Sequence, residues 1–213
     1  MANPLDLADS PAMDDIIPPE VLLNAYAQGV FPMAEAGKIS WYRPQMRGLI
    51  PLDERFHIPH GLQRALKRRP FELRWNTAFR DVMLACAQRE QTWINEVIVE
   101  SYGLLHRLGF AHSVECWDEE GLQGGLYGVA LRGAFFGESM FSRKTDASKI
   151  ALVELVAGLR QAGVVLLDTQ WMTVHLRQFG GYELPRKQYE RALAAALLVD
   201  GGLGRGVFPP PQA

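Results

Sequence analysis

One carboxylate of the sequence stands in an apolar setting where a buried charge would need a partner. Glu138 lies between Phe136 and Met140 in the stretch GGLYGVALRGAFFGESMFS, which spans residues 124–142. Burying a carboxylate is costly unless a cation or a hydrogen-bond donor meets it, so this position is a candidate for chemistry. The alternative is that Glu138 sits at a wet edge of a sheet and has no chemical role.

A second polar pair follows a short apolar run nearer the C-terminal end. Asp168 comes directly after VVLL, residues 164–167, and Gln170 stands two residues further on. The apolar run is typical of a buried strand, and polar groups of α/β proteins gather at the ends of such strands. Two side chains at this spacing can leave the strand on the same side. The alternative is that Asp168 caps a helix that we expect to run on to Phe179.

Several common kinds of site lack their sequence patterns. The Gly-x-Ser-x-Gly of α/β-hydrolases is absent, as are the glycine-rich GxxxxGK[ST] and GxGxxG loops that hold phosphates. His57 and His60 form an HxxH without a third ligand, which argues against a metal site. Cys86 and Cys116 form no CxxC, so neither a disulfide framework nor a zinc site is indicated.

The totals describe an ordinary globular chain without a global basic field. The 213 residues carry a net charge of -2 and are 48% hydrophobic, enough for a sizeable core. A nucleic acid partner would need a local patch, and the helix expected at 61–69 offers one with Lys67 and Arg68. Such a run is also typical of a merely solvated helix face. No apolar run reaches about eighteen residues and no signal sequence opens the chain, so we expect a cytoplasmic protein.

The elements that would position Glu138, Asp168 and Gln170 can be read from periodicity. The stretch 124–142 predicts a β-hairpin turned around Arg132-Gly133, and alternation places Phe136, Glu138, Met140 and Ser142 on one face. The remaining predicted helices and strands lie at 20–28, 71–75, 76–87, 97–108, 112–117, 146–162 and 185–199. Their order predicts an α/β (α+β) fold with a mixed sheet flanked by helices.

A boundary between two domains is expected before the main predicted strands begin. Pro44 and Gly48 punctuate the chain after an aromatic, turn-rich stretch that contains Met33. We therefore expect a small N-terminal domain, residues 1–47, followed by the main domain, residues 48–213.

Taken together, nine short motifs resemble the leucyl/phenylalanyl-tRNA–protein transferase family over most of the chain, from about Tyr26 to Leu193. The motifs are GVFPM, ISWY, TWI, GGLYGVA, GESMFSR, ASK, LLDTQ, FGG and ELPRKQY. Each string is weak alone, but GESMFSR followed by ASK and then by D-x-Q at these separations is highly specific. The resemblance implies an acetyltransferase-like catalytic domain behind a small N-terminal domain.

The activity implied by the resemblance is transfer of Leu or Phe from aminoacyl-tRNA to the N-terminal amine of proteins that begin with Arg or Lys. This reaction marks the acceptor for degradation by the N-end rule pathway. The acyl ester is already activated, so no cofactor, ATP or metal is implied. An α-amine with a pKa near ~8 is partly neutral at pH 7 and needs mainly positioning.

The resemblance also implies roles for particular residues. Gln170 would orient the attacking amine, Asp168 would hold Gln170 or assist proton movement, and Glu138 would hold polar ends of the substrates. Lys67 and Arg68 would touch the tRNA acceptor stem. The residues implied for the aminoacyl group and the terminal adenosine are Met33, Trp93, Tyr127, Met140, Phe141, Ser142, Leu155 and Leu159. An apolar pocket of this kind would separate Leu from Met only weakly, by about 1–3 kcal/mol.

The chain departs from the family pattern in its N-terminal part. Met33 stands where Trp is usual after GxFP, so a softer sulfur contact would replace stacking on the adenosine. The usual WWSPDPR reads WYRPQMR from Trp41 to Arg47. The short C-terminal tail also departs. None of these changes touches Glu138, Asp168 or Gln170.

Two other functions remain open on the sequence alone. An acyl-CoA N-acyltransferase is one, although its pyrophosphate loop [Q/R]xxGx[G/A] has no full match; RQFGGY from Arg177 fails at the last position. A non-catalytic adaptor that binds N-terminal residues is the other. It would use an acidic pocket around Glu138 but would need neither Trp93 nor Gln170.

Overall fold

A seven-stranded mixed sheet forms the centre of the protein, in a computed structural model that describes residues 16–202. Its strand order is β4-β5-β6-β7-β8-β3-β9, and only the β7–β8 pair is parallel. The strands are β3 (Met46–Ile50), β4 (Glu72–Trp75), β5 (Ala111–Asp118), β6 (Gly121–Leu131), β7 (Ala134–Ser142), β8 (Leu166–Asp168) and β9 (Tyr182–Pro185). The predicted fold class, a mixed sheet flanked by helices, is confirmed.

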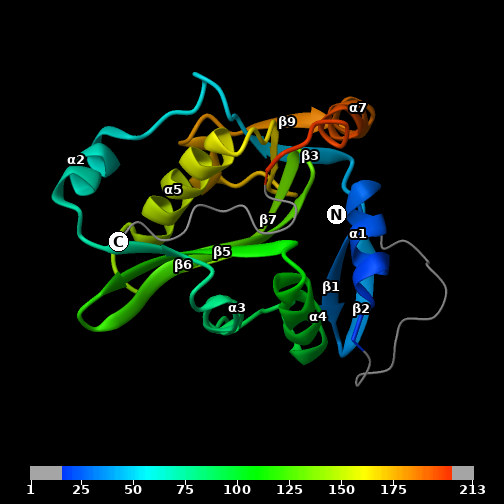
Figure 1. Ribbon diagram of the computed structural model, residues 1–213, viewed down its shortest axis with the longest axis horizontal. Helices are drawn as coiled ribbons and strands as arrows, with labels where there is room; N and C mark the ends of the chain where they lie inside the picture. The colour runs from blue at the N-terminus through cyan, green and yellow to red at the C-terminus, as the bar shows by residue number, and fades with distance from the viewer. Residues whose placement is uncertain (1–15, 203–213) are drawn as a thin grey trace.

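Helices cover both faces of this sheet and enclose two apolar cores. Figure 1 shows α5 on one side of β5 and β6, with α3 and α4 on the other. Residues of α1, α3, α4 and α7 form the first core, and residues of α5 dominate the second. The helices are α1 (Pro19–Ala27), α2 (His60–Arg68), α3 (Phe79–Ala87), α4 (Glu96–Arg107), α5 (Ala147–Gln161), α6 (Val174–Arg177) and α7 (Arg186–Ala196).

The N-terminal part adds a second, two-stranded sheet. Strands β1 (Phe31–Glu35) and β2 (Lys38–Tyr42) pair antiparallel beside α1, and their apolar residues join the first core. The sequence predicted neither of these two strands, nor β3 and β9. The predicted boundary after residue 47 falls inside β3, which pairs with β8 and β9. The division into residues 1–47 and 48–213 stays a prediction, and both ends of the chain lie outside the described residues.

The predicted hairpin at 124–142 is present, but its second strand carries a bulge. Tyr127 pairs with Ser139 and Gly128 pairs with Gly137, so Glu138 has no partner on β6. An extra residue in one strand reverses the side-chain alternation beyond it. The prediction that Phe136 and Met140 share a face is therefore wrong, because Phe136 packs in the first core and Met140 against the second.

The helix predicted to reach Phe179 is shorter than expected. Helix α6 has four residues and begins only after Thr173, whose side chain caps it. Among the described helices, none is long and apolar enough to cross a membrane.

Candidate functional site

Two neighbouring strands separate at the centre of the sheet, and polar side chains gather there. The last parallel pair between β7 and β8 joins Phe136 to Asp168, where β8 ends, while β7 continues to Ser142. Glu138 follows this pair on β7, and Gln170 follows it on the other segment. The two polar groups singled out from the sequence therefore meet at one point of the sheet.

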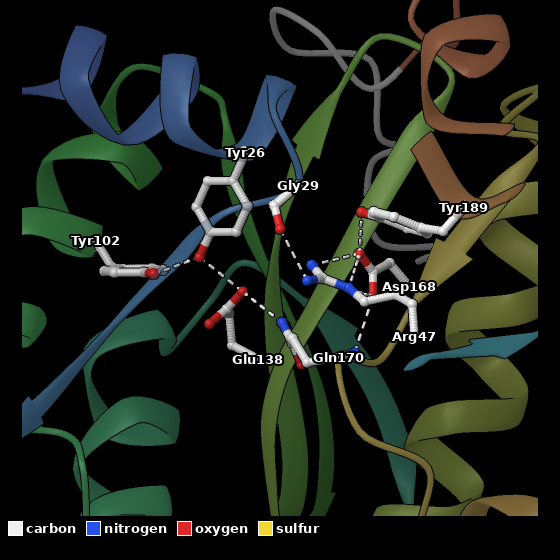
Figure 2. Close-up of polar contacts among 8 residues, drawn as sticks. All are labelled: Tyr26, Gly29, Arg47, Tyr102, Glu138, Asp168, Gln170 and Tyr189. Atoms are coloured by element: carbon white, nitrogen blue, oxygen red, sulfur yellow. Dashed lines mark hydrogen bonds and ion pairs between the residues drawn. The ribbon is translucent and has the colours of Figure 1, made fainter. Parts of the chain in front are cut away.

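Glu138 is held by donors from two distant segments. Its Oε1 accepts a hydrogen bond from the Tyr26 hydroxyl at 2.7 Å and another from Gln170 Nε2 at 3.0 Å (Figure 2). The Tyr26 hydroxyl in turn shares a hydrogen bond with the Tyr102 hydroxyl. β7 lies between β6 and β8, so the alternative of a wet sheet edge is wrong.

The surroundings of Glu138 favour its neutral form. The pKa of Glu138 is raised from 4.5 to about 8, chiefly because the group is buried and also because the Asp168 carboxylate lies nearby. The hydrogen bonds from Tyr26 and Gln170 and the charge of Arg47 act in the opposite direction. A carboxyl with this pKa can take up and release a proton near neutral pH.

Asp168 is fully buried, and its carboxylate is occupied by protein groups. Arg47 Nε lies 2.9 Å from both carboxylate oxygens, and Arg47 Nη2 forms an ion pair with Oδ2 at 2.7 Å. The Tyr189 hydroxyl donates to Oδ2 at 2.5 Å. The alternative that Asp168 caps the following helix is wrong, because these bonds and Thr173 replace that role. A carboxylate paired in this way is suited to holding structure.

The backbone of Gln170 is fixed in a conformation that non-glycine residues rarely adopt. Its φ is 56°, in the left-handed region, which costs about 1–2 kcal/mol. Two bonds hold it there: its N–H donates to Asp168 Oδ1 at 2.8 Å, and its carbonyl accepts from Gly48 N at 2.9 Å. The result is a buried amide side chain aimed at Glu138 (Figure 2).

Beside this polar cluster lies a cavity of about 310 Å³ with mostly apolar walls. Seven of the residues singled out from the sequence line it together. They are Met33, Trp93, Tyr127, Glu138, Met140, Leu155 and Gln170. Such a space, apolar with a few convergent polar groups, is typical of a small-molecule binding site.

The other residues singled out from the sequence lie away from the cavity walls. Leu159 is in the second core, Phe141 is in the first, and Ser142 caps α5 by accepting a hydrogen bond from Ser148 N. Asp168 does not line the cavity, but its carboxylate accepts a hydrogen bond from the backbone N–H of Gln170. Lys67 and Arg68 lie exposed in the last turn of α2, at one end of the molecule.

Sequence reasoning missed the residues that support the site. Arg47 also donates to the Gly29 carbonyl at 2.9 Å and lies over the rings of Phe31 and Tyr189. Its signal in the sequence was faint: a charged residue directly before the apolar run Gly48-Leu49-Ile50. Tyr26 and Tyr189 sit on amphipathic helices, where a buried tyrosine is indistinguishable from ordinary core.

The arrangement can orient and deprotonate an amine next to an apolar group. Gln170 offers a fixed amide, Glu138 offers a carboxyl with a pKa near neutrality, and the cavity offers apolar walls. Within residues 16–202, no group of three or more His, Cys, Asp or Glu side chains is arranged to hold a metal ion.

Comparison with known proteins agrees with these features. The family model for leucyl/phenylalanyl-tRNA protein transferase matches residues 49–194, and the model for its N-terminal domain matches residues 15–45. Three relatives are named leucyl/phenylalanyl-tRNA–protein transferase. That of Akkermansia muciniphila is 64% identical, over 87% of this chain and 98% of its own length. Those of Herpetosiphon aurantiacus and Phenylobacterium zucineum are 54% and 57% identical, over 84% and 83% of this chain and 94% and 82% of their own lengths.

The similarity to solved structures is weaker. "The structure of L-PGS from Bacillus licheniformis" superimposes with a TM-score of 0.40 and 14% identity over 73% of this chain and 51% of that one. This similarity is too distant to carry an argument about fold or function. The matches in sequence are decisive, because they span both parts of the chain and reach the cavity: the chain is a transferase that belongs to the leucyl/phenylalanyl-tRNA protein transferase family.

Proposed function

We propose that this enzyme moves Leu or Phe, and Met less well, from aminoacyl-tRNA to the N-terminal α-amine of proteins that begin with Arg or Lys. The product would carry a new peptide bond and a signal for N-end rule degradation in the cytoplasm. The observation that carries the proposal is the contact between Gln170 and Glu138, two residues that line a mostly apolar cavity. An amide and a tunable carboxyl are what aminolysis of an ester needs, because the ester is already activated.

The proposed reaction uses two polar groups that line the cavity, Gln170 and Glu138. The neutral amine of the acceptor attacks the ester carbonyl carbon while Gln170 holds it in line. Its proton passes to Glu138, whose pKa near 8 matches that of an α-amine, about 7.7–8.0. The carbon–oxygen bond to the terminal ribose then breaks, and the proton goes to that ribose oxygen. Asp168 holds the backbone of Gln170 throughout.

The tRNA would be held at three places. The cavity's apolar walls, with Met140 and Leu155, would receive the aminoacyl side chain. Trp93 would stack on the terminal base, worth about 1–3 kcal/mol. The exposed Lys67 and Arg68 on α2 would contact phosphates of the acceptor stem.

Transfer to two matched acceptors tests this function. Purified enzyme is given labelled Leu-tRNA and a model protein whose first residue is either Arg or Ala. Label on the Arg protein alone, lost after RNase treatment of the Leu-tRNA, is expected. Folded enzyme that binds the Arg N-terminus without transferring label would instead favour an adaptor, and equal labelling of both acceptors would exclude the proposed acceptor class.

A further inference from the structure

Three buried polar atoms on the cavity wall have no hydrogen-bond partner among the described residues. They are the Tyr127 hydroxyl, Thr169 Oγ1 and His175 Nε2. A buried polar group without a partner destabilises the folded state, and few occur in folded proteins. Their gathering in one cavity indicates that a bound molecule supplies their partners.

The proton on the His175 ring can be assigned from its neighbour. Gln178 Nε2 donates to the His175 backbone carbonyl at 2.7 Å, which fixes which end of that amide carries hydrogen. The same Nε2 lies 3.3 Å from His175 Nδ1, so Nδ1 accepts. In a neutral imidazole the other nitrogen then carries the hydrogen, and His175 Nε2–H is a donor without a protein acceptor.

The surroundings of His175 favour its neutral form. Burial lowers its pKa, and Lys149 lowers it further, while Asp146 acts in the opposite direction. The group facing the cavity is therefore a neutral N–H, suited to an oxygen acceptor rather than to an anion that would need a full positive charge.

The polar groups of the cavity divide into two kinds. Glu138 offers a carboxyl that accepts hydrogen bonds, which suits an amine. His175 offers a donor, and the Thr169 hydroxyl, from the same segment of chain, can donate as well. An aminoacyl ester presents two polar ends to such a cavity: an α-amine, which donates, and a carbonyl oxygen, which only accepts.

We propose that His175 Nε2–H donates a hydrogen bond to the carbonyl oxygen of the aminoacyl ester and stabilises the negative charge that forms there. The inference rests on the proposed function. When the amine attacks, the second electron pair of the C=O bond moves onto this oxygen. It returns when the bond to the ribose oxygen breaks. A donor placed at such an oxygen acts most strongly in the transition state.

Two substitutions separate this role from a packing role. His175→Phe keeps a ring against Phe179 but removes the donor, and His175→Gln restores an amide N–H near the position of Nε2. Val174→Ala is the matched control, because this α6 side chain is 89% exposed. If the Phe variant does not fold, His175→Leu provides a second variant without the donor.

Two measurements are compared for each variant. One is the single-turnover rate of transfer at saturating Leu-tRNA. The other is the affinity for leucine joined to 3′-amino-3′-deoxyadenosine, whose amide linkage does not react. We expect His175→Phe to lower the rate about 100-fold and the analogue affinity by about 10-fold at most. His175→Gln should recover much of the rate, and Val174→Ala should match the unaltered enzyme.

Other results would overturn the inference. A rate for His175→Phe within about 3-fold of the unaltered enzyme would contradict a hydrogen bond that stabilises the reacting oxygen. Equal losses of rate and analogue affinity, or no recovery with Gln, would assign His175 to packing. If the unaltered enzyme transfers no leucine at all, the proposed function itself fails. If the unaltered enzyme transfers leucine and His175→Phe transfers it at the same rate, only the present inference is contradicted.

Discussion

At the scale of single residues, two carboxyl groups of the site have different surroundings: one is paired with a buried cation and the other is not. Asp168 forms an ion pair with Arg47 and accepts a hydrogen bond from the Tyr189 hydroxyl, and all three side chains are buried. Glu138 has no cation in direct contact among the described residues, and its pKa rises to about 8. In the proposed function this difference divides the roles: Asp168 would position Gln170, and Glu138 would exchange protons.

The Asp168–Arg47 pair should be essential for stability. Asp168→Asn would leave the buried Arg47 charge uncompensated, so the free energy of unfolding should fall by about 3–5 kcal/mol. Urea unfolding measures this change. Glu120→Gln is the control, since Glu120 is 68% exposed in its ion pair with Lys144 and should lose less than about 1 kcal/mol. Equal small losses in both variants would contradict the structural role of Asp168.

The raised pKa of Glu138 predicts a pH dependence of stability. Its folded pKa of about 8 lies above the ordinary 4.5, so the folded state binds the extra proton between these values. The contribution is fully present below 4.5 and is lost as pH rises towards 8, with a slope of at most about 1.4 kcal/mol per pH unit.

Urea unfolding of the unaltered enzyme and Glu138→Gln across this window tests the prediction. The stability of the unaltered enzyme should decline relative to that of Glu138→Gln as pH rises. A constant difference between the two would show that Glu138 titrates as an ordinary exposed carboxyl.

At the scale of elements, the bulge in β7 decides where Glu138 points. Gly128, its neighbour on β6, has no room for a side chain: a Cβ would collide with the Phe136 carbonyl oxygen and the Phe135 ring. Gly128→Ala should therefore lower the free energy of unfolding by about 3 kcal/mol.

Gly103 provides the matched control for Gly128. In α4 a Cβ would meet only Arg107 Nη1 at 3.7 Å, so Gly103→Ala should stabilise the protein by about 0.5–1 kcal/mol. Both changes are measured by thermal or urea unfolding. Stabilisation by Gly128→Ala would contradict the packing described for the bulge.

Elements with strong periodicity were predictable from the sequence, and local irregularities were not. The hairpin was predicted from its alternating pattern, and α5 was predicted from its amphipathic pattern. A one-residue bulge leaves no mark on composition. The sequence therefore assigned Phe136 and Met140 to the same face of β7, although they lie on opposite faces. The segment after Gln170 looked helical, but the left-handed φ of Gln170 turns the chain before α6 begins.

The candidate site was predictable in part, for a related reason. Glu138 stood out because it interrupts an apolar strand, and Asp168 and Gln170 stood out because they follow the end of one. Arg47 did not, because its partner Asp168 is 121 residues away and nothing local demands a buried guanidinium. Tyr26 reaches Glu138 across a separation of 112 residues. Long-range pairs of this kind follow from tertiary packing, which a single sequence does not display.

At the scale of the whole molecule, charge must be local for a nucleic acid to bind. The net charge is -2, so attraction to tRNA would come from α2 rather than from the overall field. Helix α2 lies beside α5 in Figure 1, at the opposite end of the molecule from α7. The separation allows a patch on α2 to be tested against one on α7.

Removing the α2 patch should weaken tRNA binding in a salt-dependent way. The double variant Lys67→Ala, Arg68→Ala should bind Leu-tRNA less tightly at low salt. Its plot of log affinity against log salt should be shallower by about one unit for each lost phosphate contact. Filter binding over a range of salt measures this slope. Arg191→Ala on α7 should leave the slope unchanged, and equal effects of both changes would contradict a role for α2.

The transfer rate of Gln170→Ala at saturating Leu-tRNA, in a single turnover, tests the central claim most directly. The amide of Gln170 joins Glu138 at the point where β7 and β8 separate, and its loss should slow transfer by about 100-fold. Gln170→Gly is compared with it, because glycine accepts a φ of 56° without strain. A loss shared by both variants assigns the effect to the amide. Transfer at the full rate by Gln170→Ala would contradict the account.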